Sequence, residues 1–281
     1  MDYSLTTWRL IQTPAASGAW NMAVDEAILE AVGLNKAPAT LRLYAWEPPC
    51  LSLGYAQPAT DVYHNALVSR GWGLVRRPTG GRAILHTDEL TYAVIAPHSE
   101  PRLAGGVLES YQRISVALLH ALHLLGIPAE ARATPLPIGL NGEEDNPSKG
   151  PVCFEAPSNY EITVNGKKLV GSAQARRKEG ILQHGSLPLH GDLRRITLAL
   201  TFPSPKERKA AAKRLLERAT TVKYIFGRVI RWEEAAQAFI QAFKETLTLN
   251  LSSTDLSPAE LSRASELVQE KYANPLWTER V

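Results

Sequence analysis

Residues 150–189 read GPVCFEAPSNYEITVNGKKLVGSAQARRKEGILQHGSLPL, and this stretch decides much of the fold. Residues 160–164 have the composition of a strand and lead into Asn165-Gly166, a dipeptide typical of a tight hairpin turn. Residues 168–171 then predict the second strand of the hairpin, and residues 180–189 predict a further strand. The stretch therefore predicts a hairpin followed by another strand.

The rest of the chain places strands early and helices late. An amphipathic helix follows Ser17-Gly18, residues 108–125 form the clearest helix, and the pattern is helical from Ser204 onward. The segments that read as strands are 7–12, 41–46, 50–56, 71–77, 82–85 and 91–96, with 41–46 and 50–56 expected to pair. Strands with segregated helices predict an α+β fold with a mixed, mostly antiparallel sheet, packed helices and a helical C-terminal segment.

Composition excludes several classes of protein. The chain has 281 residues, 44% of them hydrophobic, which is enough for a globular core. No apolar run approaches the roughly 18 residues of a membrane span, and no signal peptide is evident, so we expect a cytoplasmic protein without a membrane partner. A net charge of +3 is too small to predict nucleic-acid binding, and no metal-ligand spacing is present. The basic run at 206–214 is either a solvated helix face or a docking face for an acidic partner.

One cysteine precedes a lysine in the opening stretch. Cys153 lies 15 residues before Lys168, and a nearby ammonium group would favour the thiolate, the form of cysteine that can carry an acyl group. A lone cysteine is usually an inert apolar residue, and Lys168 alone could be a solvated hairpin residue. The loop position of Cys153 and the fixed position of Lys168 favour acyl transfer through a thioester.

A second motif, RRPTGGRAILH, occupies residues 76–86. Gly80 and Gly81 permit close approach of the backbone to a ligand, although paired glycines after a strand also form plain hairpin turns. Three arginines, Arg76, Arg77 and Arg82, could neutralise a phosphate. His86 taken alone is more often a hydrogen-bonded structural histidine than a catalyst.

A third motif contains small residues. Gly171, Ser172 and Ala173 would let a long, narrow ligand lie against their strand. The polar residues that follow, Gln174, Gln183 and His184, could simply satisfy backbone groups near the sheet.

Together these motifs resemble the biotin/lipoate protein ligase superfamily. RRPTGGRAILHTDELTYAV resembles its arginine–glycine signature, and GKKLVGSAQARRKEGILQHGSLPL resembles the segment that holds its catalytic lysine and the wall of its substrate tunnel. PVCFEAPSNYEI and the closing KYANPLW resemble the octanoyltransferases of the LipM type. The resemblance runs from about residue 7 to about residue 243 and implies a ligase-like catalytic domain at residues 1–250, with a helical tail at 251–281 packed on it.

The resemblance also implies an activity. An acyltransferase of this type moves octanoate from octanoyl-acyl carrier protein to a lysine of a lipoyl-carrier protein, such as the glycine cleavage H protein, without a cofactor or metal. Cys153 and Lys168 would be the catalytic residues. The residues implied in substrate binding are Arg76, Gly80, Gly81, His86, Gly171, Ser172 and Ala173.

Three alternatives stay open at this point. An ATP-dependent lipoate–protein ligase would keep the lysine and need no cysteine nucleophile. An amidotransferase would move octanoate between carrier proteins. A scaffold or module that binds acyl carriers would keep the fold without the chemistry, but the presence of both Cys153 and Lys168 argues against it.

Overall fold

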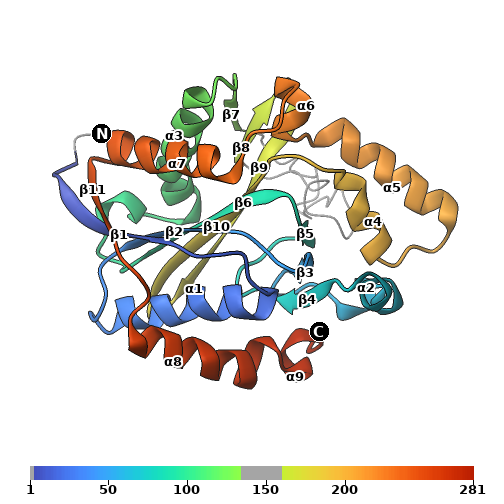
Figure 1. Cartoon of the computed structure of the whole chain (residues 1–281), viewed down its shortest axis with the longest axis horizontal. Helices are drawn as coiled ribbons and strands as arrows, with labels where there is room; N and C mark the ends of the chain where they lie inside the picture. Colours follow the sequence, from blue (N-terminus) through green and yellow to red (C-terminus); the bar gives the residue numbers. More distant parts are fainter. Residues whose placement is uncertain (1–2, 134–159) are drawn as a thin grey trace, which may run out of the picture.

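The computed structural model describes residues 3–133 and 160–281 (Figure 1). The strands are β1 (Thr6–Gln12), β2 (Thr40–Tyr44), β3 (Cys50–Leu53), β4 (Gly73–Arg76), β5 (Ile84–His86), β6 (Glu89–Ala96), β7 (Glu130–Ala133), β8 (Tyr160–Val164), β9 (Lys167–Arg177), β10 (Gly180–Pro188) and β11 (Leu249–Ser253). The helices are α1 (Gly18–Gly33), α2 (His64–Arg70), α3 (Val107–Leu124), α4 (Ile196–Ala199), α5 (Pro205–Arg218), α6 (Val222–Phe226), α7 (Trp232–Leu247), α8 (Pro258–Leu267) and α9 (Pro275–Thr278). Short 3-10 turns lie at Ala59–Asp61, Pro101–Leu103 and Leu193–Arg195, and a π-helical turn lies at Val268–Tyr272.

The described strands form a large sheet and a small one. The large sheet has the order β11-β1-β2-β6-β10-β9-β8-β7, and the small sheet has the order β4-β3-β5. In the large sheet β1 pairs in parallel with β2 and β11, whereas the other pairings are antiparallel. The predicted α+β class with a mixed, mostly antiparallel sheet is thereby confirmed.

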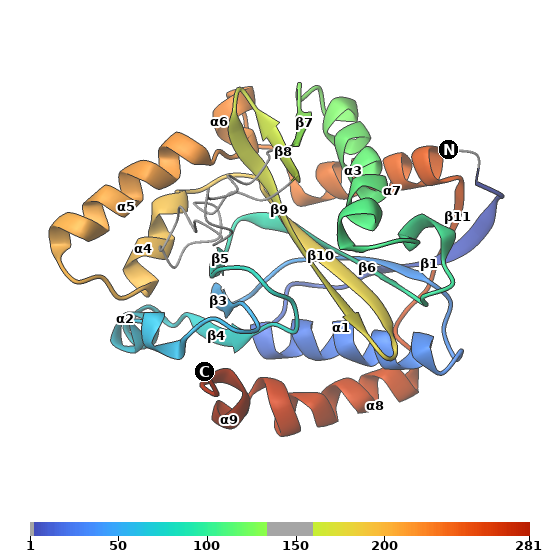
Figure 2. The ribbon, with the colours of Figure 1, turned by 180° about the vertical axis from the view of Figure 1, so that it is seen from behind.

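Helices cover both faces of the large sheet. On one face α3 and α7 pack against each other and against the sheet, enclosing the largest apolar core (Figures 1 and 2). On the other face α1 lies between the sheet and α8, with a second core around Met22, Ile28 and Leu182. A third core joins the small sheet to α2, α4 and α5. Within residues 3–133 and 160–281, no helix is both long and apolar enough to span a bilayer.

The predicted hairpin at Asn165-Gly166 is present. Asn165 and Gly166 have φ of +50° and +76°, the left-handed conformation that a tight hairpin turn requires. They join β8 to β9, and β9 extends well beyond the predicted residues 168–171 because it continues to pair with β10 as far as Arg177.

The expected pairing of residues 41–46 with 50–56 is wrong. β2 is already paired on both edges, with β1 and β6, so it belongs to the large sheet. β3 belongs to the small sheet, between β4 and β5.

The segment after α7 contains a strand as well as helices. Ser257 caps α8 in a capping box with Glu260, and Glu260 also forms a buried ion pair with Arg9 of β1. The short strand β11 precedes α8 and was not evident in the sequence. Since β11 joins the main sheet, it ties this end of the chain to β1. The division of the chain at residue 250 stays a prediction.

Candidate active site

A narrow pocket opens where the large sheet, the small sheet and the start of α1 meet. It encloses about 440 Å³, part of it open to solvent. Six residues predicted to bind substrate line it together: Gly80, Gly81, His86, Gly171, Ser172 and Ala173. The structure also places in its wall residues that the sequence did not indicate, which are Met22, Tyr44, Trp46, Ser52, Ile84, Thr91, Gly185 and Ser186.

The turn that carries Gly80 and Gly81 packs backbone against backbone. A Cβ atom on Gly54 would lie 1.8 Å from the carbonyl oxygen of Gly81, and Gly81 itself has a φ of +91°. Both positions therefore require glycine. A Cβ atom on Gly80, in contrast, would meet no described atom within 4 Å, so Gly80 borders open space.

His86 belongs to a buried polar chain in the pocket wall. Its Nδ1 lies 2.7 Å from Glu89 Oε1, its Nε2 lies 2.8 Å from Ser52 Oγ, and its ring stacks on Trp46 at 3.9 Å. Burial alone would raise the pKa of Glu89, but His86 and the hydroxyl groups of Thr91 and Ser186 outweigh it and lower that pKa. His86 is thus both a hydrogen-bonded structural histidine and part of the pocket lining.

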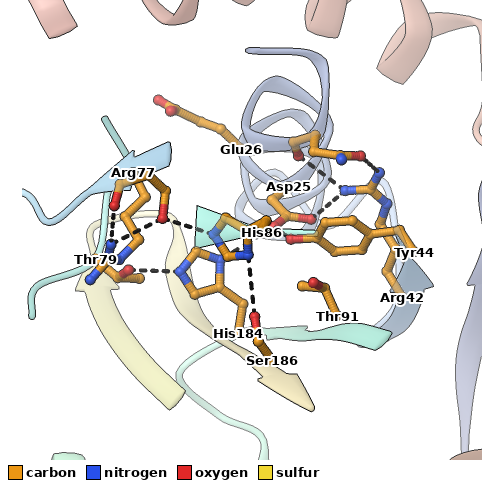
Figure 3. Close-up of polar contacts among 12 residues, drawn as sticks. Asp25, Glu26, Arg42, Tyr44, Arg77, Thr79, His86, Thr91, His184 and Ser186 are labelled. Carbon is orange, nitrogen blue, oxygen red and sulfur yellow. Dashed lines mark hydrogen bonds and ion pairs between the residues drawn. The ribbon is translucent and has the colours of Figure 1, made fainter. Parts of the chain in front are cut away.

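A second histidine connects the pocket to α1. His184 Nε2 lies 2.7 Å from Thr79 Oγ1 in the glycine turn, and His184 Nδ1 lies 3.5 Å from Asp25 Oδ2 (Figure 3). Burial lowers the pKa of His184, although Asp25 opposes this effect, so we infer a neutral ring at pH 7.

Asp25 is itself fully buried and holds two side chains of β2. It accepts hydrogen bonds from Arg42 Nη1 at 2.7 Å and from the Tyr44 hydroxyl at 2.9 Å. Burial raises the pKa of Asp25, but the guanidinium of Arg42 and the ring of His184 more than compensate, so the pKa is lowered. Asp25 therefore stays ionised inside the protein.

The two neighbouring arginines at the end of β4 have different positions. Arg77 reaches the pocket, where it donates to Ser52 O and Gly80 O. Arg76 is fully buried away from the pocket lining and donates to Gly54 O, Gln57 O and Thr278 O. The structure thus brings Arg77 rather than Arg76 to the described pocket, while Arg82 lines an open groove beside it.

Lys168 lies on β9, three residues before the pocket residue Gly171. Its Nζ donates to Glu161 Oε1 at 3.0 Å, and both side chains are largely buried. Tyr111 on α3 faces the same pair: burial raises the pKa of Tyr111, the nearby Lys168 cation opposes this shift, and Glu161 adds to it. The predicted partner of Lys168, Cys153, lies outside the described residues.

The other cysteine, Cys50, is unsuited to nucleophilic chemistry. It is buried in β3, and burial raises the pKa of its thiol to about 12. A Cβ atom on Gly18 would lie 2.3 Å from its Sγ, which shows how tightly α1 covers it.

Asp25, Arg42 and Thr79 were not identified as site residues from the sequence, although Asp25 and Arg42 are charged residues within apolar segments. Asp25 occupies the buried side of α1 together with Met22 and Ile28, where a charged residue is unexpected. Arg42 interrupts an apolar strand, LRLY, whose residues are all buried. A charge in an apolar face needs a buried partner, and that requirement was the available signal.

Comparison with known proteins places these features in a family. The model of the lipoyl protein ligase A/B catalytic domain matches residues 17–244. An octanoyltransferase LipM from Brevibacillus brevis is 41% identical over 278 residues, covering 97% of this chain and 99% of that protein. Another octanoyltransferase LipM, from Kyrpidia tusciae, is 42% identical over 277 residues, covering 98% of this chain and 100% of its own length.

Comparison with solved structures supports the same family. The bi-partite lipoate protein ligase of Thermoplasma acidophilum superposes with a TM-score of 0.77 at 27% identity, covering 98% of this chain and 96% of the other. A lipoate-protein ligase A bound with ATP gives a TM-score of 0.76 at 25% identity, covering 98% and 99% of the two chains. The chain belongs to the family of the lipoyl protein ligase A/B catalytic domain.

Proposed function

We propose that this protein is an octanoyltransferase of protein lipoylation. It takes the octanoyl group from octanoyl-acyl carrier protein, holds it as a thioester on Cys153, and passes it to a lysine of a lipoyl-carrier protein of the glycine cleavage H protein type. The observation that carries the proposal is the narrow pocket lined by Gly171, on the same strand as Lys168, in a chain 41% identical along nearly its whole length to an octanoyltransferase.

The pocket suits an unbranched apolar chain. Its walls combine two small residues on one face of β9, Gly171 and Ala173, with the apolar side chains of Met22 and Ile84. Small residues two positions apart on a strand leave space along one face of the sheet, and apolar walls favour transfer of a hydrocarbon chain out of water.

In the first step the Cys153 thiolate attacks the thioester carbonyl of the donor. The new carbon–sulfur bond forms as the bond to the carrier breaks, and the carrier thiolate leaves and takes up a proton. Lys168, held through Nζ by Glu161, donates a hydrogen bond to the oxygen on which negative charge develops. Its positive charge also favours the thiolate form of Cys153.

In the second step the uncharged ε-amine of the acceptor lysine attacks the octanoyl-cysteine carbonyl. An amide bond forms, the Cys153 thiolate leaves, and the amine gives up one proton to solvent. Conversion of a thioester to an amide is favourable, so this pathway consumes no ATP.

The state of Cys50 supports the choice of Cys153. A thiol with a pKa of about 12 is almost entirely protonated at pH 7 and is a poor nucleophile. The chain has two cysteines, so the thioester chemistry falls to Cys153.

A second candidate function is ATP-dependent ligation of lipoate. It is favoured by the structural likeness to a lipoate-protein ligase A bound with ATP and by the groove beside the pocket, where Arg82 and Arg177 could meet a phosphate. In that reaction Lys168 would act on an acyl-adenylate and Cys153 would be dispensable.

Intact-protein mass spectrometry separates these functions. Wild type and Cys153→Ala are each incubated with octanoyl-acyl carrier protein in the absence of ATP. A single octanoyl increment on wild type alone, removed by hydroxylamine, is the expected result. The proposal fails if no adduct forms while octanoate plus ATP supports modification of a lipoyl-carrier protein, because that outcome identifies a ligase.

A further inference from the structure

Positive charge is concentrated in one segment outside the pocket. Residues 205–228, which include α5 and α6, contain eight basic and two acidic residues, a net charge of +6. The whole chain carries +3, so the remaining residues together carry −3. The basic residues are Lys206, Arg208, Lys209, Lys213, Arg214, Arg218, Lys223 and Arg228. They lie on several sides of α5 and around α6, Lys213 and Arg228 form ion pairs with Glu217 and Glu234, and we call the surface of this segment the basic face. α5 stands at the end of the molecule opposite the N-terminus (Figure 1).

The basic face borders a solvent-open hollow of about 1100 Å³. Tyr224 and Leu216 line this hollow and are 78% and 40% exposed. The lysines Lys167 and Lys223 stand beside them, with Lys167 Nζ 5.5 Å from the centre of the Tyr224 ring. The carboxylate of Asp192 also lines the hollow, and it is paired with Arg194 at 3.0 Å. An exposed ring and an exposed leucine beside two lysines are more typical of a protein-binding surface than of a solvated helix.

The hollow lies directly behind the proposed catalytic lysine. The backbone N–H of Thr220, which lines the hollow, donates to the carbonyl oxygen of Lys168 at 3.0 Å. Successive side chains on a strand point to opposite faces. Lys167 accordingly reaches across the hollow to Leu216 O, whereas Lys168 turns away to Glu161.

This geometry discriminates between the two carrier proteins of the reaction. A partner docked at the hollow must reach around the β8–β9 hairpin to act at Lys168. The acceptor offers only a lysine side chain, which is short. The acyl donor carries its thioester at the end of a long, flexible prosthetic arm, and acyl carrier proteins are acidic. Reach therefore favours the donor, and the acidity of the donor matches the positive charge of this surface.

We propose that the basic face and the hollow are the docking site of the acidic acyl carrier protein that delivers the octanoyl group. The proposal rests on the proposed function, whose donor it localises. Complementary charge speeds encounter and becomes weaker as salt is added, whereas the Tyr224 ring contributes a contact that is insensitive to salt.

The test compares two double variants that change net charge equally. Lys209→Glu with Lys223→Glu alters the basic face, and Lys36→Glu with Lys244→Glu alters exposed lysines elsewhere. The dissociation constant for octanoyl-acyl carrier protein is measured by calorimetry at low and high salt on proteins with Cys153→Ser, which blocks transfer. Transfer from octanoyl-acyl carrier protein and from octanoyl-pantetheine is measured in parallel with Cys153 intact.

We expect the first double variant to bind the carrier roughly tenfold more weakly at low salt, with the difference shrinking at high salt, and the second to bind as wild type does. Reaction with octanoyl-pantetheine should be unchanged in both. Tyr224→Ala should weaken binding at both salt concentrations. Equal affinities for the two double variants, or no binding by wild type, would refute the docking site. Salt-sensitive binding without any octanoyl transfer would keep the docking site and overturn the proposed function.

Discussion

Replacing Asp25 with alanine should destabilise the protein strongly, although Asp25 lies behind the pocket wall. The change leaves the guanidinium of Arg42 inside the protein without its carboxylate, and both side chains are completely buried. Arg42 would keep its hydrogen bonds to Asn21 and Thr13, so the loss is mainly one of charge compensation. Breaking a buried ion pair from one side costs about 3–5 kcal/mol. That is a large part of the roughly 5–15 kcal/mol by which a domain is stable.

Urea unfolding at pH 7 measures this loss, and two further variants locate its origin. Asp25→Asn keeps an acceptor for the Tyr44 hydroxyl and should lose less than Asp25→Ala. The double variant Asp25→Leu with Arg42→Met removes both charges and should recover much of the stability, because a buried pair can often be replaced by apolar residues. A loss below about 1 kcal/mol in Asp25→Ala, or no recovery in the double variant, would refute the reasoning.

The dependence of stability on pH is an independent test of the role of Asp25, because the direction of the pKa shift determines the direction of the change in stability. The pKa of Asp25 is lowered in the folded protein, so its ionised form stabilises the fold at pH values above the unfolded pKa of about 3.9. That stability is lost as the pH falls through the lower, folded-state pKa. Wild type should therefore lose its advantage over Asp25→Asn in unfolding experiments as the pH is reduced below about 4.

Three further predictions concern the chemistry and the pocket. Lys168→Ala should shift the pH profile of Cys153 alkylation upward by about one unit or more, and an unchanged profile would exclude the lysine from thiolate stabilisation. Alkylation of folded wild type at pH 8 should modify one thiol per chain, because the pKa of Cys50 is about 12; rapid modification of two thiols would contradict the burial of Cys50. Gly80→Val should change stability by less than about 1 kcal/mol, since its Cβ meets no described atom within 4 Å, yet lower kcat/KM for octanoyl transfer about 100-fold by filling the pocket. Normal transfer by a folded Gly80→Val protein would show that the acyl chain binds elsewhere.

The sequence was sufficient to predict features that depend only on residues close together in the chain. Asn165-Gly166 determines a turn within a few residues, and the structure contains that hairpin. Resemblance identified the small residues and His86 that line one pocket, although they come from β5, the turn before it and β9.

Partners distant in sequence could not be predicted. The alternation of apolar residues indicates that β2 and β3 are strands but not which strands they join, and the two belong to different sheets. β11 is short and largely exposed, and its alternation of apolar and polar residues, LNLS, covers too few residues to stand out from the helix α7 that precedes it.

Arg76 and Arg77 are adjacent in the sequence, but their side chains face different parts of the structure. Arg76 and Arg77 are equivalent in composition, but side chains alternate along an extended backbone. Arg76 consequently faces the segment around Thr278, and Arg77 faces the pocket. Which arginine meets a ligand depends on the position of β4 in the small sheet, and the sequence alone does not specify it.

The pairing of β1 with β11 has a consequence for synthesis of the protein on the ribosome. β1 emerges long before its partners, because its outer edge pairs with Leu249–Ser253 and Arg9 forms its buried ion pair with Glu260. Until those residues leave the exit tunnel, the nascent chain exposes a strand edge and an arginine without its final partner. Such edges attract other unpaired strands. The growing chain is thus vulnerable to aggregation until β11 and Glu260 have emerged, and a chaperone that shields β1 during translation would raise the yield of folded protein.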